Sequence, residues 1–250
     1  MAKNDRDAMT TIIELKEVNF SYRVFKNHKS SLRVLFREIL GGNAKLTTFN
    51  ALSNINLEIY RGEVLGVIGH NGAGKSTLLK MLAGVLPPSS GEIDISGSVA
   101  PLIELGAGFH PEMSGRENVV LYSAFLGRDI REVKSRLGEI ATWAGVSDHM
   151  DFPIRSFSSG MIARLAFATA TDSKSDILLI DEILSVGDSE FQIQSKKRIQ
   201  DLIASGTTVI FVSHDMALVS EICSRVAWLD HGSLRMVGET AAVLDSYENQ

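Results

Sequence analysis

A run of nine residues, Gly69 to Thr77, carries the strongest chemical signal in this chain. It reads Gly-His-Asn-Gly-Ala-Gly-Lys-Ser-Thr, with four residues between the first glycine and the Gly-Lys-Ser. This spacing is typical of a loop whose backbone N–H groups surround phosphate oxygens, and its glycines allow close approach because they have no Cβ. We expect Lys75 to reach the β- and γ-phosphates and the Ser76 hydroxyl to bind Mg²⁺. The predicted nucleotide-binding residues of the run are Gly69, His70, Asn71, Gly72, Ala73, Gly74, Lys75, Ser76 and Thr77.

The segments on either side of this run support the prediction. Val64–Ile68 is a short apolar run that indicates a buried strand, and Ser76 to Leu82 has the apolar stripe of a helix start. A strand followed by a glycine loop and a helix N-terminus favours binding of an anion at the start of the helix. The alternative is an ordinary glycine-rich turn between a strand and a helix, but every position of the phosphate pattern is filled.

Two later segments end apolar strands with side chains that could act on a phosphate. Ile177–Leu178–Leu179–Ile180 leads into Asp181 and Glu182, and Thr207 to Val212 leads into Ser213 and His214. We expect Asp181 to hold Mg²⁺, Glu182 to act on the attacking water and His214 to be catalytic, since doubly wound sheets bind ligands at strand ends. The alternatives are merely solvated acids and a structural histidine.

The N-terminal part is predicted to contain two strands, Ile12 to Tyr22 and Ala51 to Ile59. Tyr22 ends the first strand, where its ring could stack on a nucleotide base or be an ordinary aromatic at a strand edge. Between these strands, residues 23–45 contain six basic residues and one acid, a net charge of +5. Apolar residues at helical spacing predict a basic amphipathic helix there, which would contact an anionic membrane surface, a partner or its own domain.

The pattern becomes helical after the loop Gly106–Pro111. Ser114 and Glu117 have the spacing of a capping box, and residues 115–145 indicate helices. The small polar loop Ser156–Gly160 then opens another helix, whose N-terminus is a possible second phosphate contact. Val226 to Leu229 and Leu234 to Val237 are predicted to form a closing hairpin, followed by a short C-terminal helix.

Composition narrows the classes of function. The net charge of −5 argues against general binding to nucleic acid. The single cysteine, Cys223, excludes an internal disulfide and suits a reducing compartment. The polar first ten residues do not resemble a signal peptide, and no apolar run is long enough for a membrane span. We therefore expect a soluble, cytoplasmic protein unless a partner holds it at a membrane.

These motifs, in this order, resemble the ATP-binding subunit of ABC transporters over nearly the whole chain. Gly69–Ser76 is similar to the Walker A motif, and Ile177–Asp181 with Glu182 is similar to Walker B. Phe157–Met161 is similar to the signature loop of the family, and Leu184–Asp188 is similar to its D-loop. His214 matches the switch histidine, and Tyr22 matches the base-stacking aromatic residue. The resemblance implies an ATPase that uses ATP and Mg²⁺.

The chain departs from the usual family pattern at several positions. In the signature loop, Phe157, Ser159 and Met161 replace residues of the usual Leu-Ser-Gly-Gly-Gln, while Ser158 and Gly160 remain. The Q-loop glutamine is absent, and Glu104 is its counterpart. With these departures, the motifs resemble those of the polysaccharide-exporting branch of the family, which includes O-antigen, capsule and teichoic acid exporters. The basic helical insertion at 23–45 also resembles that branch.

The resemblance implies an α/β fold: a P-loop NTPase (RecA-like) core with an antiparallel β subdomain and an inserted α-helical subdomain. The expected nucleotide-binding domain spans 10–250, with the ATPase core and β subdomain at 10–104 and 171–238. The helical subdomain spans 105–170 and carries the signature loop. The implied function is ATP hydrolysis that drives export of a lipid-linked polysaccharide, of the O-antigen type, from the cytoplasmic face of the bacterial inner membrane.

The family also implies a head-to-tail homodimer that works with two copies of an integral membrane permease and meets the glycan only indirectly. Each ATP would lie between one phosphate loop and the partner's Ser158, Ser159 and Gly160, with Asp188 coupling the two sites. Alternatives are a teichoic acid or capsule exporter and a small-solute transporter. Soluble ABC proteins of DNA repair or translation and P-loop kinases or GTPases fit this length and these motifs less well.

Overall fold

The structure is a computed structural model that describes residues 10–25, 46–103, 105–172, 175–181 and 188–249. Several sequence predictions lie outside these residues: most of the basic helix within 23–45, the acids Glu104 and Glu182, and D-loop residues 184–187. Among the described residues, no helix combines the length and apolar character that a bilayer span requires.

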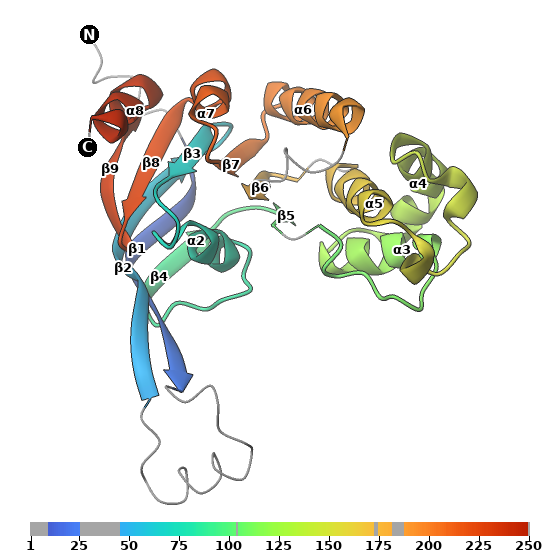
Figure 1. The fold of residues 1–250 in the computed structure, drawn as a ribbon, viewed down its shortest axis with the longest axis horizontal. Helices are drawn as coiled ribbons and strands as arrows, with labels where there is room; N and C mark the ends of the chain where they lie inside the picture. Colours follow the sequence, from blue (N-terminus) through green and yellow to red (C-terminus); the bar gives the residue numbers. More distant parts are fainter. Residues whose placement is uncertain (1–9, 26–45, 104, 173–174, 182–187, 250) are drawn as a thin grey trace, which may run out of the picture.

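A three-stranded antiparallel sheet forms one layer of the molecule (Figure 1). It contains β1 (Thr11–Phe25), β2 (Leu46–Tyr60) and β4 (Ser90–Ile95), in the order β2-β1-β4. Residues Ile13, Leu15 and Val18 of β1 are almost completely buried, whereas Lys16 is exposed. The two strands predicted in this region are confirmed, and each is longer than its apolar pattern indicated.

A six-stranded sheet forms the centre, in the order β5-β6-β7-β3-β8-β9. Its strands are β3 (Val64–Ile68), β5 (Val99–Leu102), β6 (Ile177–Asp181), β7 (Thr208–Val212), β8 (Arg225–Asp230) and β9 (Ser233–Glu239). Neighbouring strands from β5 through β8 are parallel, and β9 pairs antiparallel with β8 as the predicted closing hairpin. Central β3 is buried on both faces, which explains its continuous apolar run.

Residues of β3 alternate between two apolar cores. Leu65 and Val67 pack in the core shared with the three-stranded sheet and helix α2 (Lys75–Leu82). Val64 and Ile68 pack in the other core, which also contains residues of α5, α6, α7 and α8. These four helices are α5 (Ser159–Thr171), α6 (Ser189–Ala204), α7 (Met216–Ile222) and α8 (Thr240–Glu248). This packing on both faces fixes the carboxyl end of β3.

Helices α3 (Gly115–Phe125), α4 (Ile130–Trp143) and α5 lie together beyond β5, away from α2 (Figure 1). We call these three helices the helical unit. The predicted capping box is present, because Ser114 and Glu117 each bond the other's backbone N–H. Short 3-10 turns at Ser147–His149 and Ile154–Ser156 lead from α4 to α5. Inside the unit, the Trp143 and Phe167 rings stack with centroids 5.4 Å apart.

Candidate functional site

The phosphate-type loop joins the end of β3 to the start of α2, as the sequence predicted. Its glycines are required by backbone geometry, since Gly69 and Gly74 have φ values of 146° and 109°. A Cβ on Gly69 would lie 2.1 Å from the Leu229 carbonyl oxygen, and one on Gly74 would lie 2.7 Å from that of Ala51. A Cβ on Gly72 would meet nothing within 4 Å, so the loop is open to a ligand at that position.

Lys75 is the first residue of α2, and only 6% of it is exposed. Its Nζ donates hydrogen bonds to the carbonyl oxygens of Gly69 at 2.7 Å and His70 at 3.1 Å. These bonds fold the side chain back across the loop, where the ammonium group lies beside open space. A buried ammonium at a helix N-terminus provides a strong electrostatic field for an anion.

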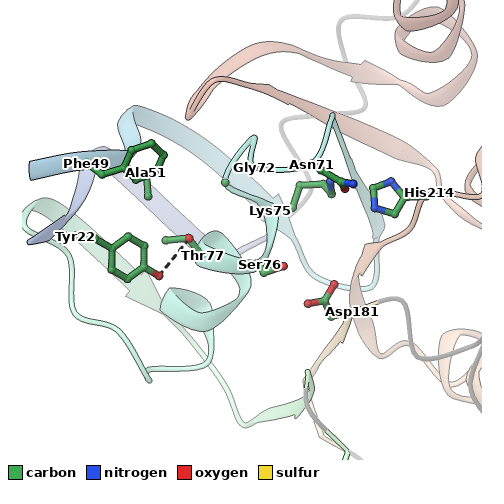
Figure 2. Close-up of a pocket in the computed structure, with 11 residues that line it drawn as sticks. Tyr22, Phe49, Ala51, Asn71, Gly72, Lys75, Ser76, Thr77, Asp181 and His214 are labelled. Atoms are coloured by element: carbon green, nitrogen blue, oxygen red, sulfur yellow. Dashed lines mark hydrogen bonds between the residues drawn. The ribbon is translucent and has the colours of Figure 1, made fainter. Parts of the chain in front are cut away.

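A cavity of about 470 Å³ opens around this loop, and Figure 2 shows the side chains that line it. This volume lies in the range of small-molecule sites. The cavity brings together residues from the loop, β1, β2 and the ends of β6 and β7. The lining residues are Tyr22, Phe49, Ala51, Asn71, Gly72, Gly74, Lys75, Ser76, Thr77, Asp181 and His214.

Asp181 and His214 reach the cavity because of the strand order. Strands β6, β7 and β3 are adjacent and parallel, so their carboxyl ends meet at one edge of the sheet. Asp181 is half-buried and pairs with Val212, two residues before the exposed His214. Figure 2 shows both side chains on the side of the cavity near Ser76 and Asn71. The sequence prediction that these residues meet the phosphate loop agrees with this geometry.

The opposite end of the cavity is aromatic. Tyr22 and Phe49 are partners in the β1–β2 pairing, and they are 37% and 58% exposed. The Tyr22 hydroxyl lies 3.5 Å from the Thr77 Oγ1 (Figure 2). Phe49 and Ala51 were not predicted as site residues. The strand signal at Ala51 was recognised, but the register that places Phe49 opposite Tyr22 could not be read from the pattern.

Three residues of the predicted run do not line the cavity: Gly69, His70 and Ala73. Gly69 is pressed against β8, and Ala73 is fully buried. The Ala73 N–H donates to the His70 carbonyl at 3.1 Å, which closes the turn of the loop. These residues therefore shape the loop, and their side chains do not face the cavity.

The predicted signature residues lie elsewhere, at the N-terminus of α5. Ser158 caps this helix by accepting a hydrogen bond from the Met161 N–H at 3.2 Å. Ser158 and Ser159 are exposed, Gly160 is half-buried, and none of the three lines the cavity. Figure 1 places α5 within the helical unit, on the far side of β5 from α2. One chain therefore does not bring its own signature residues to its own phosphate loop.

Asp188 also lies away from the cavity, at the N-cap of α6. Its carboxylate accepts a hydrogen bond from the Phe191 N–H at 2.9 Å and pairs with Arg164 of α5 at 3.5 Å. The predicted D-loop aspartate thus contacts the helix that follows the signature loop. Glu182 and Glu104 are outside the described residues, so their predicted roles are not tested by this geometry.

The donor set at the cavity suits a hard cation. Ser76 offers a hydroxyl and Asp181 a carboxylate, and both line the same wall near Lys75. Mg²⁺ prefers oxygen ligands and is commonly held by one or two protein oxygens together with substrate phosphates. The residues present therefore fit a magnesium–nucleotide complex.

Comparison with known proteins agrees with this site. A family model described as ABC transporter matches residues 52–185. The chain is 44% identical to the O-antigen export system ATP-binding protein RfbE of Yersinia enterocolitica, over 90% of this chain and 96% of that one. It is 37% identical to the teichoic acids export ATP-binding protein TagH of Enterococcus faecalis, covering 94% of this chain but 52% of the relative.

Comparison with solved structures shows a shared fold. A dimeric ATP-binding cassette solved in a post-hydrolysis state has a TM-score of 0.72 at 22% identity, over 91% of this chain and 98% of that chain. The loop, the strand order and the relatives therefore lead to one assignment. This chain belongs to the ABC transporter ATP-binding family.

Proposed function

We propose that this chain is the ATP-hydrolysing subunit of a transporter that exports a lipid-linked polysaccharide of the O-antigen type across the bacterial inner membrane. The observation that carries the ATPase assignment is the cavity in which Lys75, Ser76, Asp181 and His214 meet. The polysaccharide assignment is supported by similarity to an O-antigen export ATP-binding protein over 90% of this chain.

Each lining residue has a physical role in this proposal. The loop N–H groups and the Lys75 ammonium bind the β- and γ-phosphates, and the Tyr22 ring stacks on the base. Ser76 and Asp181 would hold Mg²⁺, which neutralises charge on the phosphate oxygens when bound. His214 contacts the γ-phosphate. Glu182, which follows Asp181 in the sequence, orients the attacking water and accepts its proton.

The proposal requires two copies of the chain. Ser158, Ser159 and Gly160 form an exposed helix N-terminus that one chain does not direct at its own cavity. In a head-to-tail homodimer, this helix end would approach the γ-phosphate bound to the partner subunit, where its partial positive charge stabilises the anion. Asp188, paired with Arg164 of the signature helix, would couple the two sites.

The remaining partners belong to the same proposal. An integral membrane permease in two copies would hold the dimer at the cytoplasmic face of the inner membrane and carry the glycan. Residues 105–170 would form the helical subdomain that moves with the signature loop. Residues 10–104 and 171–238 would form the ATPase core with its β subdomain, and 23–45 the basic insertion.

Export is tested in cells that lack this protein. We expect an undecaprenyl-linked glycan to accumulate inside the cells and its polymer to be missing from the surface. The composition of the trapped glycan then separates O-antigen from capsule or teichoic acid. When expressed in these cells, the wild-type protein should restore the surface polymer, and so should the control variant Lys197→Ala, because Lys197 is exposed. Lys75→Ala should not restore it. A normal surface with no trapped lipid would favour transport of a small solute.

The catalytic role of Glu182 is tested on the purified protein. Glu182→Gln should bind ATP, lose at least about 100-fold in turnover because the water is no longer deprotonated, and accumulate as an ATP-bound dimer. Glu190→Gln is the matched control, since Glu190 is exposed in the first turn of α6. Chromatography with ATP and a phosphate-release assay measure both properties. Full hydrolysis by Glu182→Gln would rule out the assigned role.

A further inference from the structure

Two histidines and an aspartate meet beside the phosphate loop, outside the nucleotide cavity. His70 comes from the loop, while Asp230 and His231 come from the end of β8 and the turn that follows it. One ligand atom from each of the three lies within 4.8 Å of the other two. The His70 Nε2 is 3.3 Å from the Asp230 Oδ1, and the His231 Nε2 is 3.8 Å from that same oxygen. None of the three lines the cavity.

The surrounding contacts orient the atoms of this cluster that face one another. The His70 Nδ1 lies 2.7 Å from the Asn71 carbonyl oxygen, so it carries the proton and donates it. That contact leaves Nε2, the atom that faces Asp230, as the ring nitrogen that can bind a metal. Arg235 pairs with the other carboxylate oxygen, Oδ2, at 3.3 Å. Such outer partners commonly orient metal-binding histidines and carboxylates.

We propose that His70, Asp230 and His231 bind a divalent late first-row transition metal of the Zn²⁺ class. Two imidazole nitrogens and one carboxylate oxygen are a common zinc ligand set that leaves a fourth position for water. Ligand atoms around tetrahedral zinc lie roughly 3.3–3.5 Å apart, given bond lengths of about 2.0–2.2 Å. The His70–Asp230 distance of 3.3 Å already matches this spacing, the His231–Asp230 distance of 3.8 Å is somewhat longer, and the His231 side chain is exposed.

The site would join two segments that the fold already places in contact. The Gly232 N–H, next to His231, donates to the Ala73 carbonyl of the phosphate loop at 3.0 Å. The Leu229 carbonyl lies against Gly69. A metal bound by His70 and His231 would add a strong link between this loop and the β8–β9 turn. The inference concerns binding alone and does not depend on the proposed transport function.

The test uses full-length, EDTA-treated protein without nucleotide. Titration calorimetry with ZnCl₂ should show one equivalent bound per chain, and Co²⁺ should give the intense visible absorption of a tetrahedral site. Excess Mg²⁺ should not displace either metal, because imidazole ligands suit zinc and cobalt better than magnesium. His231→Asn should weaken binding at least tenfold. Asparagine tolerates the left-handed backbone at this position, where φ is 46°, so the turn should be retained.

Two matched variants separate this site from others. His149→Asn removes an exposed histidine of the 3-10 turn between α4 and α5, and His214→Asn removes the histidine of the nucleotide cavity. Both should bind Zn²⁺ as the wild type does. The proposal is overturned by the absence of saturable binding, by unchanged affinity in His231→Asn, or by loss of binding in His214→Asn, which would place the metal in the nucleotide cavity.

Discussion

The phosphate-loop region and the helical unit differ in how their functional residues are arranged. Around the loop, side chains from β1, β2, β6 and β7 converge on one cavity. In the helical unit, Ser158 and Ser159 project from the N-terminus of α5 into solvent. The first region is a concave site and the second is an exposed helix N-terminus. In the homodimer that we propose, the signature end of one chain would complete the cavity of the other.

The two regions are also stabilised differently. Strand β3 is buried on both faces by apolar side chains. The helical unit has a buried ion cluster in which the Asp172 carboxylate, 5% exposed, accepts hydrogen bonds from Arg128 at 2.8 Å and Arg136 at 2.8 and 2.9 Å. Burial alone would raise the pKa of Asp172, but the hydrogen bonds from the two guanidinium groups hold that pKa below its ordinary value.

The largest expected effect comes from damaging each half of the site separately. Lys75→Ala should lose nucleotide binding, whereas Ser158→Arg should keep it. Hydrolysis by either variant should fall at least about 100-fold, because a group that stabilises charge on the phosphate is lost or blocked. A mixture of the two inactive variants should regain activity, since a mixed dimer has one intact site. Phosphate release and fluorescent ATP binding measure this. Normal hydrolysis by Ser158→Arg would mean that the signature end is not part of the site.

The next effect concerns the helical unit alone. Asp172→Asn leaves two arginines near a neutral group, and we expect it to lower the free energy of unfolding by about 3 kcal/mol, as loss of one partner in a buried ion pair does. Asp151→Asn is the control, because Asp151 is 77% exposed and pairs with Arg116 at the surface. Denaturant unfolding followed by tryptophan fluorescence measures both. Equal stability of the two variants would show that the Asp172 cluster contributes little.

Acid should affect the same cluster. Because the pKa of Asp172 is lowered in the folded chain, the unfolded chain takes up the proton first as pH falls. The stabilisation is therefore present above the ordinary carboxyl pKa of about 3.9 and is lost progressively as pH falls through it toward the folded pKa. Unfolding measured between pH 7 and pH 3 should show this loss, and Asp172→Asn should show a shallower dependence. Parallel curves would assign acid sensitivity to other groups.

The smallest effect is expected at the surface ion pair that joins α5 of the helical unit to the start of α6. The Arg164–Asp188 pair is 3.5 Å long and partly exposed, with 32% and 62% of the side chains accessible. Arg164→Ala should change the free energy of unfolding by less than about 1 kcal/mol, as is usual for exposed pairs. Thermal unfolding and ATP turnover measured together would show whether this pair matters more for coupling than for stability.

The sequence predicted secondary structure well where a motif follows directly on an apolar run. The apolar run Val64–Ile68 was predicted with the bounds of β3, and the apolar run Ile177–Ile180 was predicted with the correct start of β6, because both strands are buried. Helices α6 and α7 were not predicted. Helix α6 buries only Phe191, Ser195 and Ile199, which is too sparse a stripe to indicate a helix. Its start depends on the Asp188 cap, a local hydrogen bond that apolar spacing does not reveal.

Contacts between segments that are far apart in the sequence could not be predicted from the sequence either. Tyr22 faces Phe49 only because β1 and β2 pair in one particular register. His70 meets Asp230 and His231 because β3 and β8 are neighbours, although the segments are far apart in the sequence. Neither contact has a local signal in the chain. Periodicity identifies the elements, whereas these parts of the site depend on how the elements pair.

The position of β3 has a consequence for the order in which the protein is made. Its two neighbours in the sheet, β7 and β8, both lie more than a hundred residues further along the chain. A ribosome therefore completes the phosphate-loop motif long before it releases the strands that hold it in place. Asp181 and His214 belong to the lining of the nucleotide cavity, so the nascent chain cannot complete this cavity until β6 and β7 have emerged.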